Sequence, residues 1–107
     1  MKKKVYIAGP YTRGDVCVNV AAAMDAWHVL YGMGFTPFCP HVTHFLHLHR
    51  PNIDVEGWYA YDLEWLEGCD ALLRLPGDST GADKEVARAA ELGINVYYTI
   101  ESLALNE

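Results

Sequence analysis

A short run of small and polar residues, 76–85, combines a turn, an expected helix start and an acidic side chain. It follows an aliphatic stretch and contains Ser79, Gly81 and Glu85. At such a junction the unpaired N–H groups and the positive end of the helix dipole favour an anion, and Ser79 adds a hydroxyl donor. Glu85 lies about one turn into the expected helix, from which its carboxylate can reach the same cleft. An N-cap serine followed by an exposed glutamate also explains this pattern.

A second acidic residue lies within another expected helix, residues 57–67. Asp62 shares that helix with the aromatic side chains of Trp58, Tyr61 and Trp65. Apolar surroundings favour the protonated form of a carboxylic acid, which can then act as a general acid. A second carboxylate would serve as the nucleophile, which is the division of roles found in retaining glycosidases. A solvated charge on the helix surface accounts for Asp62 equally well.

The turn after the first expected strand offers a phenol and a guanidinium. Gly9 and Pro10 end the strand, and Tyr11 and Arg13 follow. Glycine allows a ligand to approach the backbone closely, and the arginine fork suits phosphate. The turn has neither the P-loop pattern nor the dinucleotide-binding glycine pattern, so it predicts no nucleoside triphosphate or dinucleotide. An ordinary strand-to-helix turn explains it equally well.

Four histidines gather between residues 41 and 49. The spacing of His41, His44, His47 and His49 matches no standard zinc site, and no nearby cysteine completes one. We therefore expect no metal here. We expect His41 and His44 to line a pocket as imidazole donors and His47 and His49 to be exposed. The segment 41–56 lacks periodicity and predicts a long loop with room for a helical turn at its start.

Alternating strand and helix patterns carry these residues. Strands are expected at residues 4–8, 35–39, 70–75 and 94–98, and helices at 16–31, 57–67, 82–92 and 100–105. This order predicts an α/β fold of the compact flavodoxin-like (Rossmann-like) type. It is a three-layer sandwich with a parallel sheet of four to five strands, in the order 2-1-3-4. Pro37 favours an edge position for the second strand. Ligands bind such sheets outside the carboxyl ends of the strands, so the loops after the first and third strands should meet there.

Size and composition limit the function classes. With 107 residues, the chain is expected to form a single domain over residues 1–107. Eight Lys and Arg residues against fourteen Asp and Glu residues leave a formal net charge of −6, which argues against binding to a nucleic acid backbone. No apolar run reaches the length of a membrane span. Three scattered cysteines without a CxxC pair predict reduced thiols in a cytoplasmic protein.

Four segments of the chain together resemble a known family. They are Tyr-Ile-Ala-Gly-Pro-Tyr at 6–11, Pro-Phe-Cys-Pro-His at 37–41, Asp-Leu-Glu-Trp-Leu-Glu-Gly-Cys-Asp-Ala-Leu-Leu at 62–73 and Ser-Thr-Gly-Ala-Asp-Lys-Glu at 79–85. In this order they resemble the nucleoside 2-deoxyribosyltransferase-like superfamily, specifically its DUF4406-type branch, over nearly the whole chain. The resemblance extends to 2′-deoxynucleoside 5′-monophosphate N-glycosidases, which share an Asp-Leu-Glu-Trp-Leu segment and a serine six residues before the nucleophilic glutamate.

The resemblance implies a role for each matching residue. Glu85 would be the nucleophile, Asp62 the acid/base partner and Ser79 a phosphate ligand, with Tyr11 near the nucleophile. The transferases usually carry aspartate where this chain has Ser79, which favours hydrolysis of nucleotides over base exchange. The remaining residues expected to bind substrate are Gly9, Pro10, Arg13, His41, His44 and Gly81. Such chemistry needs no metal and no organic cofactor.

The implied function is an N-glycosidase that cleaves the base–sugar bond of (deoxy)nucleoside 5′-monophosphates through a covalent glycosyl-Glu85 intermediate. The alternatives are a nucleoside 2-deoxyribosyltransferase that exchanges bases, and a nucleotide-binding or sensing module without turnover. The expected partner is a small nucleoside or nucleotide, not a nucleic acid polymer or a membrane. Members of the superfamily build their sites at subunit contacts, and Trp27, Trp58 and Trp65 offer apolar surface for a homodimer or a larger homo-oligomer.

Overall fold

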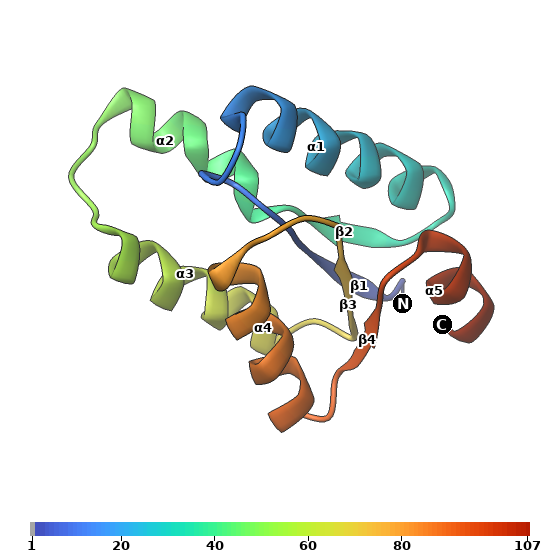
Figure 1. Ribbon diagram of the computed structural model, residues 1–107. Helices are drawn as coiled ribbons and strands as arrows, with labels where there is room; N and C mark the ends of the chain where they lie inside the picture. Colours follow the sequence, from blue (N-terminus) through green and yellow to red (C-terminus); the bar gives the residue numbers. More distant parts are fainter. Residues whose placement is uncertain (1) are drawn as a thin grey trace.

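Four parallel strands form the centre of the protein, shown in Figure 1 as a computed structural model that describes residues 2–107. β1 (Lys4–Ala8) pairs with both β2 (Thr36–Phe38) and β3 (Ala71–Arg74), and β3 pairs with β4 (Asn95–Tyr97). The order β2-β1-β3-β4 is the order predicted from the sequence. Pro37 lies in β2, an edge strand that pairs with β1 on one side. Proline has no backbone N–H, and at the edge of the sheet this does not interrupt pairing with another strand.

Helices cover both faces of this sheet, so the predicted three-layer sandwich is confirmed. α1 (Val16–Gly32) and α5 (Ile100–Asn106) contribute to the core on one face, and α3 (Val55–Glu67) and α4 (Thr80–Glu91) to the core on the other. Within residues 2–107, no helix is both long enough and apolar enough to cross a membrane.

The two cores follow from the alternation of side chains along a strand. In β1, Val5 and Ile7 join the core under α1, whereas Tyr6 and Ala8 join the core under α3 and α4. All four side chains are fully buried. A tyrosine therefore lies in the middle of the central strand, on the face that α4 covers.

Capping side chains set the start of the helices. The Asp15 carboxylate accepts from Val18 N at 3.1 Å and caps α1. Asp54 accepts from Gly57 N at 2.7 Å, and Ser79 accepts from Ala82 N at 3.0 Å. Because these caps satisfy N–H groups of the first turn, α3 and α4 each begin two residues earlier than the sequence pattern predicted.

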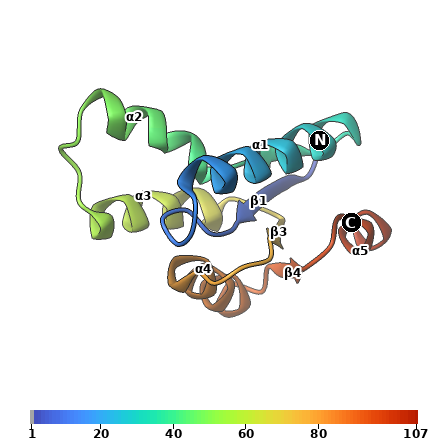
Figure 2. The same cartoon turned by 45° about the horizontal axis from the view of Figure 1, so that its top comes forward.

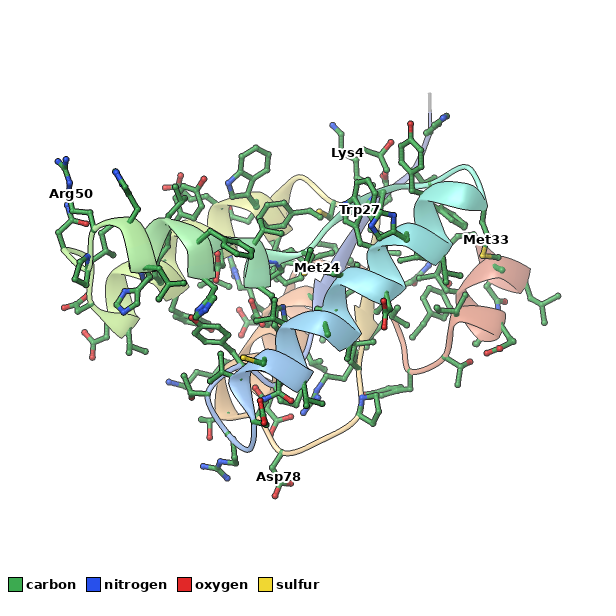
Figure 3. All side chains as sticks on the ribbon, turned by 90° about the horizontal axis from the view of Figure 1, so that it is seen from above. Lys4, Met24, Trp27, Met33, Arg50 and Asp78 are labelled. Atoms are coloured by element: carbon green, nitrogen blue, oxygen red, sulfur yellow. The ribbon has the colours of Figure 1, made fainter. Side chains whose placement is uncertain are left out.

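The loop expected over residues 41–56 is wrong for its first part. A 3₁₀ turn at Pro40–Val42 leads directly into α2 (Thr43–His49), and a loop over 50–54 joins α2 to α3. No residue of α2 is buried. A seven-residue helix without a buried face has no hydrophobic periodicity, so the sequence pattern could not indicate it. Figures 1 and 2 show α2 and α3 projecting together on one side of the molecule, and Figure 3 shows Arg50 at the far end of α2.

The turn between β3 and α4 packs against the turn after β1. Gly77 adopts a φ of +114°, and a Cβ atom added to it would lie 2.8 Å from Cγ of Pro10. Only glycine accepts both this backbone conformation and this close approach. Asp78, the next residue of the turn, points outward (Figure 3). The contact with Pro10 thus brings together the two turns that precede α1 and α4.

We expect Gly77→Ala to lower the free energy of unfolding more than Gly93→Ala. Both glycines have positive φ, but a Cβ atom at Gly93 would meet nothing within 4 Å. The conformational cost common to both is about 1 to 2 kcal/mol, and the collision with Pro10 should add about 1 kcal/mol or more to the Gly77 variant. Urea denaturation of both variants measures the difference. Equal losses in the free energy of unfolding would mean that the turn accommodates the added Cβ atom at residue 77 without an energetic penalty.

Candidate active site

A cavity of about 490 Å³ opens at the carboxyl ends of the strands. Its walls come from the turn after β1, the segment after β2, helix α3 and the start of α4. This is where ligands bind to parallel α/β sheets, because the chain leaves β1 and β3 toward opposite faces. The residues from the predicted site that line the cavity are Gly9, Tyr11, Arg13, His41, Asp62, Ser79, Gly81 and Glu85.

Glu85 is the most buried carboxylate of the cavity wall. It lies in the second turn of α4, only 6% of its surface is exposed, and Oε2 accepts a hydrogen bond from the hydroxyl of Tyr6. Burial raises the pKa of Glu85 to about 7, although the Tyr6 hydrogen bond and the positive charge of Arg74 both favour the ionised form. Burial and the nearby Glu85 also raise the pKa of Tyr6, so the phenol remains protonated and donates.

Asp62 reaches the same cavity from α3. Its Oδ1 atom is buried and has no hydrogen-bond partner among the described residues. Burial, followed by the negative charge of Glu85, raises the pKa of Asp62 to about 7. Of the two interpretations left open by the sequence, the structure therefore favours a carboxyl in apolar surroundings over a solvated surface charge. Because the two carboxyl groups interact, they titrate as a pair.

Ser79 caps α4 and also lies in the wall of the cavity. As the N-cap of α4 its Oγ accepts from Ala82 N at 3.0 Å, and the residue also lines the cavity. A serine hydroxyl that accepts one hydrogen bond still has a proton to donate. With Thr80 and Gly81, which also line the cavity, it places the positive end of a twelve-residue helix at this wall.

Tyr11 lines the cavity, but its hydroxyl bonds to Nδ1 of His44 and not to Glu85. Burial raises the pKa of the Tyr11 phenol. His44, expected to line the pocket, does not line it and instead bonds to a residue that does. The reason is tertiary: α2 places His44 beside the turn after β1, where its ring meets that of Tyr11 edge to face.

His41 is buried, and its Nε2–H donates to the carbonyl of Pro10 at 2.8 Å. Burial lowers the pKa of His41, so the neutral ring with its proton on Nε2 is favoured. Pro10 does not line the cavity; it acts through this carbonyl and through its contact with Gly77. His47 and His49 are both exposed, as expected, and His47 also lines the cavity.

Several residues of this site carry little signal in the sequence. Tyr6 was assigned only to a strand; a polar hydroxyl in an otherwise aliphatic strand was the available signal. Trp58 and Tyr59 line the cavity from α3, and burial together with Glu85 raises the pKa of Tyr59. The other lining residues are Thr12, Pro40, Thr43, His47, Ile53, Val55, Thr80 and Ala82.

The structure also bears on two other expectations, which concern metal binding and the assembly of several chains. Within residues 2–107, no group of three or more His, Cys, Asp or Glu side chains is arranged to hold a metal ion. The three tryptophans differ in environment. Trp65 is half exposed, Trp58 lines the cavity, and Trp27 is partly buried and donates to Pro37 O at 3.0 Å. Assembly into a homodimer or larger homo-oligomer stays a prediction.

Solved structures share this fold. A 2-deoxyribosyltransferase from the psychrotolerant bacterium Bacillus psychrosaccharolyticus superposes with a TM-score of 0.64 at 24% sequence identity, covering 87% of this chain and 69% of its own. A 2-deoxyribosyltransferase from Leishmania mexicana superposes with a TM-score of 0.63 at 21% identity, covering 88% of this chain and 61% of its own. The chain thus spans less than two thirds of the second protein. Among curated proteins, no sequence matches significantly.

A protein-family model also matches the sequence. It matches residues 3–99, which is most of the chain, and it describes a domain of unknown function. The finer placement in the DUF4406-type branch stays a prediction, since the match is to a different family. Because this match spans most of the chain, the chain belongs to the DUF7768 family.

Proposed function

We propose that the protein cleaves the N-glycosidic bond of (deoxy)nucleoside 5′-monophosphates. The observation that carries this proposal is the pair Glu85 and Asp62, two carboxyl groups with raised pKa values in one cavity. The shared fold with two solved 2-deoxyribosyltransferases supports chemistry on nucleosides. The cavity volume also lies within the range of about 300–1,000 Å³ that is common for small-molecule sites.

Glu85 and Asp62 have different partners, and these partners suggest which of the two carboxyl groups carries the proton. Glu85 accepts from Tyr6 and experiences the charge of Arg74, and both effects favour its ionised form. Asp62 has a buried oxygen without a partner among residues 2–107, and burial together with the charge of Glu85 favours its protonated form. These different partners favour the proton on Asp62 and the negative charge on Glu85. This is the state that a nucleophile and a general acid require.

In the proposed reaction, the Glu85 carboxylate forms a bond to C1′ of the sugar as the bond from C1′ to the base breaks. The base leaves with the bonding electron pair and takes the proton from Asp62. A water molecule then attacks C1′, gives a proton to the Asp62 carboxylate and releases Glu85. The sugar phosphate and the free base are the products, and both carboxyl groups return to their starting state.

The start of α4 would bind the 5′-phosphate. Ser79 can donate its hydroxyl proton, and the helix N-terminus favours an anion. Arg13, which also lines the cavity, supplies a positive charge from the turn after β1. At the other end of the substrate, Trp58 offers an aromatic face for stacking against the base.

Two other functions use the same cavity. A transferase would replace the attacking water by a second base, and the two solved neighbours favour this alternative by name. A nucleotide sensor would bind without turnover. Incubation with a panel of deoxynucleosides and their monophosphates, followed by chromatography of the free base, separates the three. Base release supports the hydrolase, exchange that requires an added base supports the transferase, and binding alone supports the sensor.

Replacing Glu85 by glutamine should abolish cleavage while preserving the fold, because the amide oxygen still accepts from Tyr6 but cannot capture C1′. We expect kcat to fall by about a thousandfold or more, over 4 kcal/mol of barrier. The exposed Glu91→Gln on the same helix is the matched control and should keep wild-type turnover. Turnover of Glu85→Gln near the wild-type rate would remove Glu85 from the reaction.

Replacing Ser79 by alanine should weaken monophosphates and leave nucleosides nearly unaffected. A lost hydrogen bond to a charged oxygen costs about 1.5–3 kcal/mol, or roughly 10- to 150-fold in affinity. Loss of the helix cap is the confounding effect, about 1 kcal/mol of stability. Thr99→Ala controls for it, since Thr99 caps α5 in the same way by accepting from Ser102 N. Titration calorimetry of each variant with monophosphates and with nucleosides measures the two affinities. If the wild-type protein binds both ligand classes equally well, there is no phosphate site.

The protonation of Asp62 should be visible in folding stability. Its pKa rises from 3.8 to about 7 on folding, so between these pH values the folded protein binds more protons than the unfolded chain. Stability is therefore lost as pH rises through this window. Asp62→Asn removes this loss and should gain about 2–3 kcal/mol relative to wild type between pH 5 and pH 8.

Urea denaturation at both pH values measures this gain, with Glu64→Gln, an exposed residue of α3, as the control. A difference between Asp62→Asn and wild type that does not change with pH would mean that Asp62 is ionised throughout.

A further inference from the structure

An arginine ends the otherwise aliphatic strand β3. Arg74 follows Ala71, Leu72 and Leu73, and its side chain is only 10% exposed. It pairs in register with Ala8 of β1, and strand alternation places it on the same face as Leu72, the face that α4 covers. A guanidinium in such a position requires hydrogen-bond and charge partners, because burial of an unpaired charge is strongly unfavourable. The hydrogen-bond and ion-pair partners of Arg74 therefore indicate its role.

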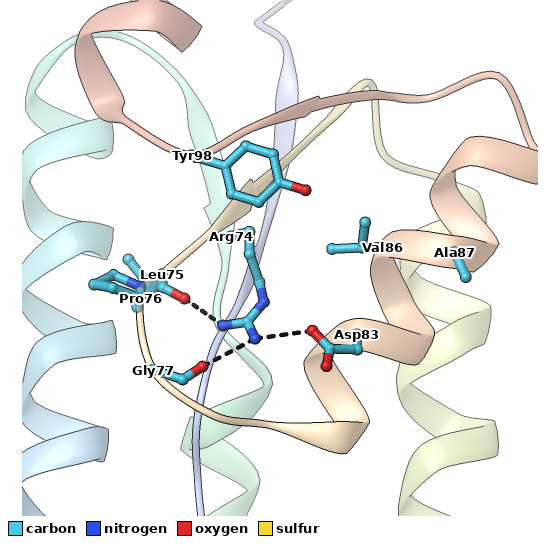
Figure 4. A pocket seen from close by; sticks show the side chains of 8 residues that line it. All are labelled: Arg74, Leu75, Pro76, Gly77, Asp83, Val86, Ala87 and Tyr98. Carbon is cyan, nitrogen blue, oxygen red and sulfur yellow. Dashed lines mark hydrogen bonds and ion pairs between the residues drawn. The ribbon is translucent and has the colours of Figure 1, made fainter.

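Three acceptors surround the guanidinium, as Figure 4 shows. Nη1 donates to the carbonyl of Leu75, and Nη2 donates to the carbonyl of Gly77 and to Oδ1 of Asp83, both at 3.0 Å. The two carbonyls belong to the turn between β3 and α4, and Asp83 lies in the first turn of α4. A single side chain thus joins the end of β3, the turn and the helix that carries Glu85.

The charge of Arg74 is only partly neutralised by its ion pair. The Asp83 side chain is 73% exposed, so water screens its carboxylate. Glu85, two residues further along α4, is buried and faces the cavity instead. The titratable groups that act on or respond to the Glu85 carboxyl are Tyr6 from β1, Tyr59 and Asp62 from α3, and Arg74 from β3. Of these four, only Arg74 is a cation.

We infer that Arg74 is a positioning residue for Glu85, because its guanidinium ties the β3–α4 turn to the first turn of α4 and places a buried positive charge on the sheet face that α4 covers. This inference rests on the proposed role of Glu85 as the nucleophile. It explains why a strand inside the core ends in a charged residue. It also assigns separate roles to neighbouring acidic residues of α4: Asp83 pairs with Arg74 at the surface, and Glu85 reacts in the cavity.

The test compares Arg74→Met, which removes the charge and the bonds, with Arg74→Lys, which keeps the charge but loses the planar fork. Carbon-13 NMR of labelled glutamate carboxyl groups follows the titration of Glu85 directly, and Glu85→Gln assigns its signal. In Arg74→Met we expect the pKa of Glu85 to rise by about one unit, the lower end of the effect of a nearby opposite charge. In Arg74→Lys we expect it to stay close to wild type.

Activity gives the second readout. The acid limb of the kcat/KM profile should move upward with Arg74→Met by the same amount as the Glu85 titration. With Arg74→Lys the limb should stay in place while kcat falls about tenfold, because the turn is less firmly held. A merely structural role would lower the rate of both variants and move neither pH profile. Arg88→Met is the control: this partly exposed arginine of α4 pairs with Glu67 and Glu91.

If Arg74→Met does not fold, Arg74→Gln, which retains amide donors without the charge, replaces it in both measurements. An unchanged Glu85 titration in the uncharged variant overturns the inference. The proposed function fails separately, if wild type releases no base from any substrate, and the NMR titration still decides the role of Arg74 in that case. An active wild type with an unshifted Glu85 in Arg74→Met removes only the inference about Arg74.

Discussion

A carboxylate held away from water, against the central strand, is the constraint on which the candidate site depends. Glu85 lies on the face of α4 that packs on β1, and the hydroxyl of Tyr6 donates to it from the strand. A buried carboxylate without partners would be strongly unfavourable, so its neighbours must supply a donor and a positive charge. Strand alternation meets this need, because it directs Tyr6 from β1 and Arg74 from β3 to the face that α4 covers.

Similar burial with different partners gives the two carboxyl groups different chemistry. Burial raises the pKa of both Asp62 and Glu85, but only Glu85 has a donor and a cation close by. Asp62 faces the negative charge of Glu85 with one oxygen unpaired. Asymmetry of this kind is how one site keeps an acid and a base at the same pH. The packing of α3 and α4 on one face of the sheet therefore does more than complete the core.

The cavity has one well-packed side and one loosely packed side. The sheet, α3 and α4 form a buried core around Glu85, whereas α2 buries none of its residues. The hydrogen bond between Tyr11 and His44 joins α2 to the turn after β1. Segments with few buried contacts open more readily than the core. The side of the cavity formed by α2 is thus the less buried side.

Local patterns in the sequence were sufficient for the strand order and for the meeting of the turn after β1 with the segment that carries Ser79 and Glu85; they left the surroundings of Asp62 open. Buried strands and helix caps carry their signal in neighbouring residues, and the topology of parallel sheets places the loops. The tertiary structure alone decided that α2 is a helix and which residues contact Glu85. Tyr6 and Glu85 are 79 positions apart, and Tyr11 and His44 are 33 apart. No local pattern encodes contacts of such separation, because they form only when the packed elements bring the side chains together.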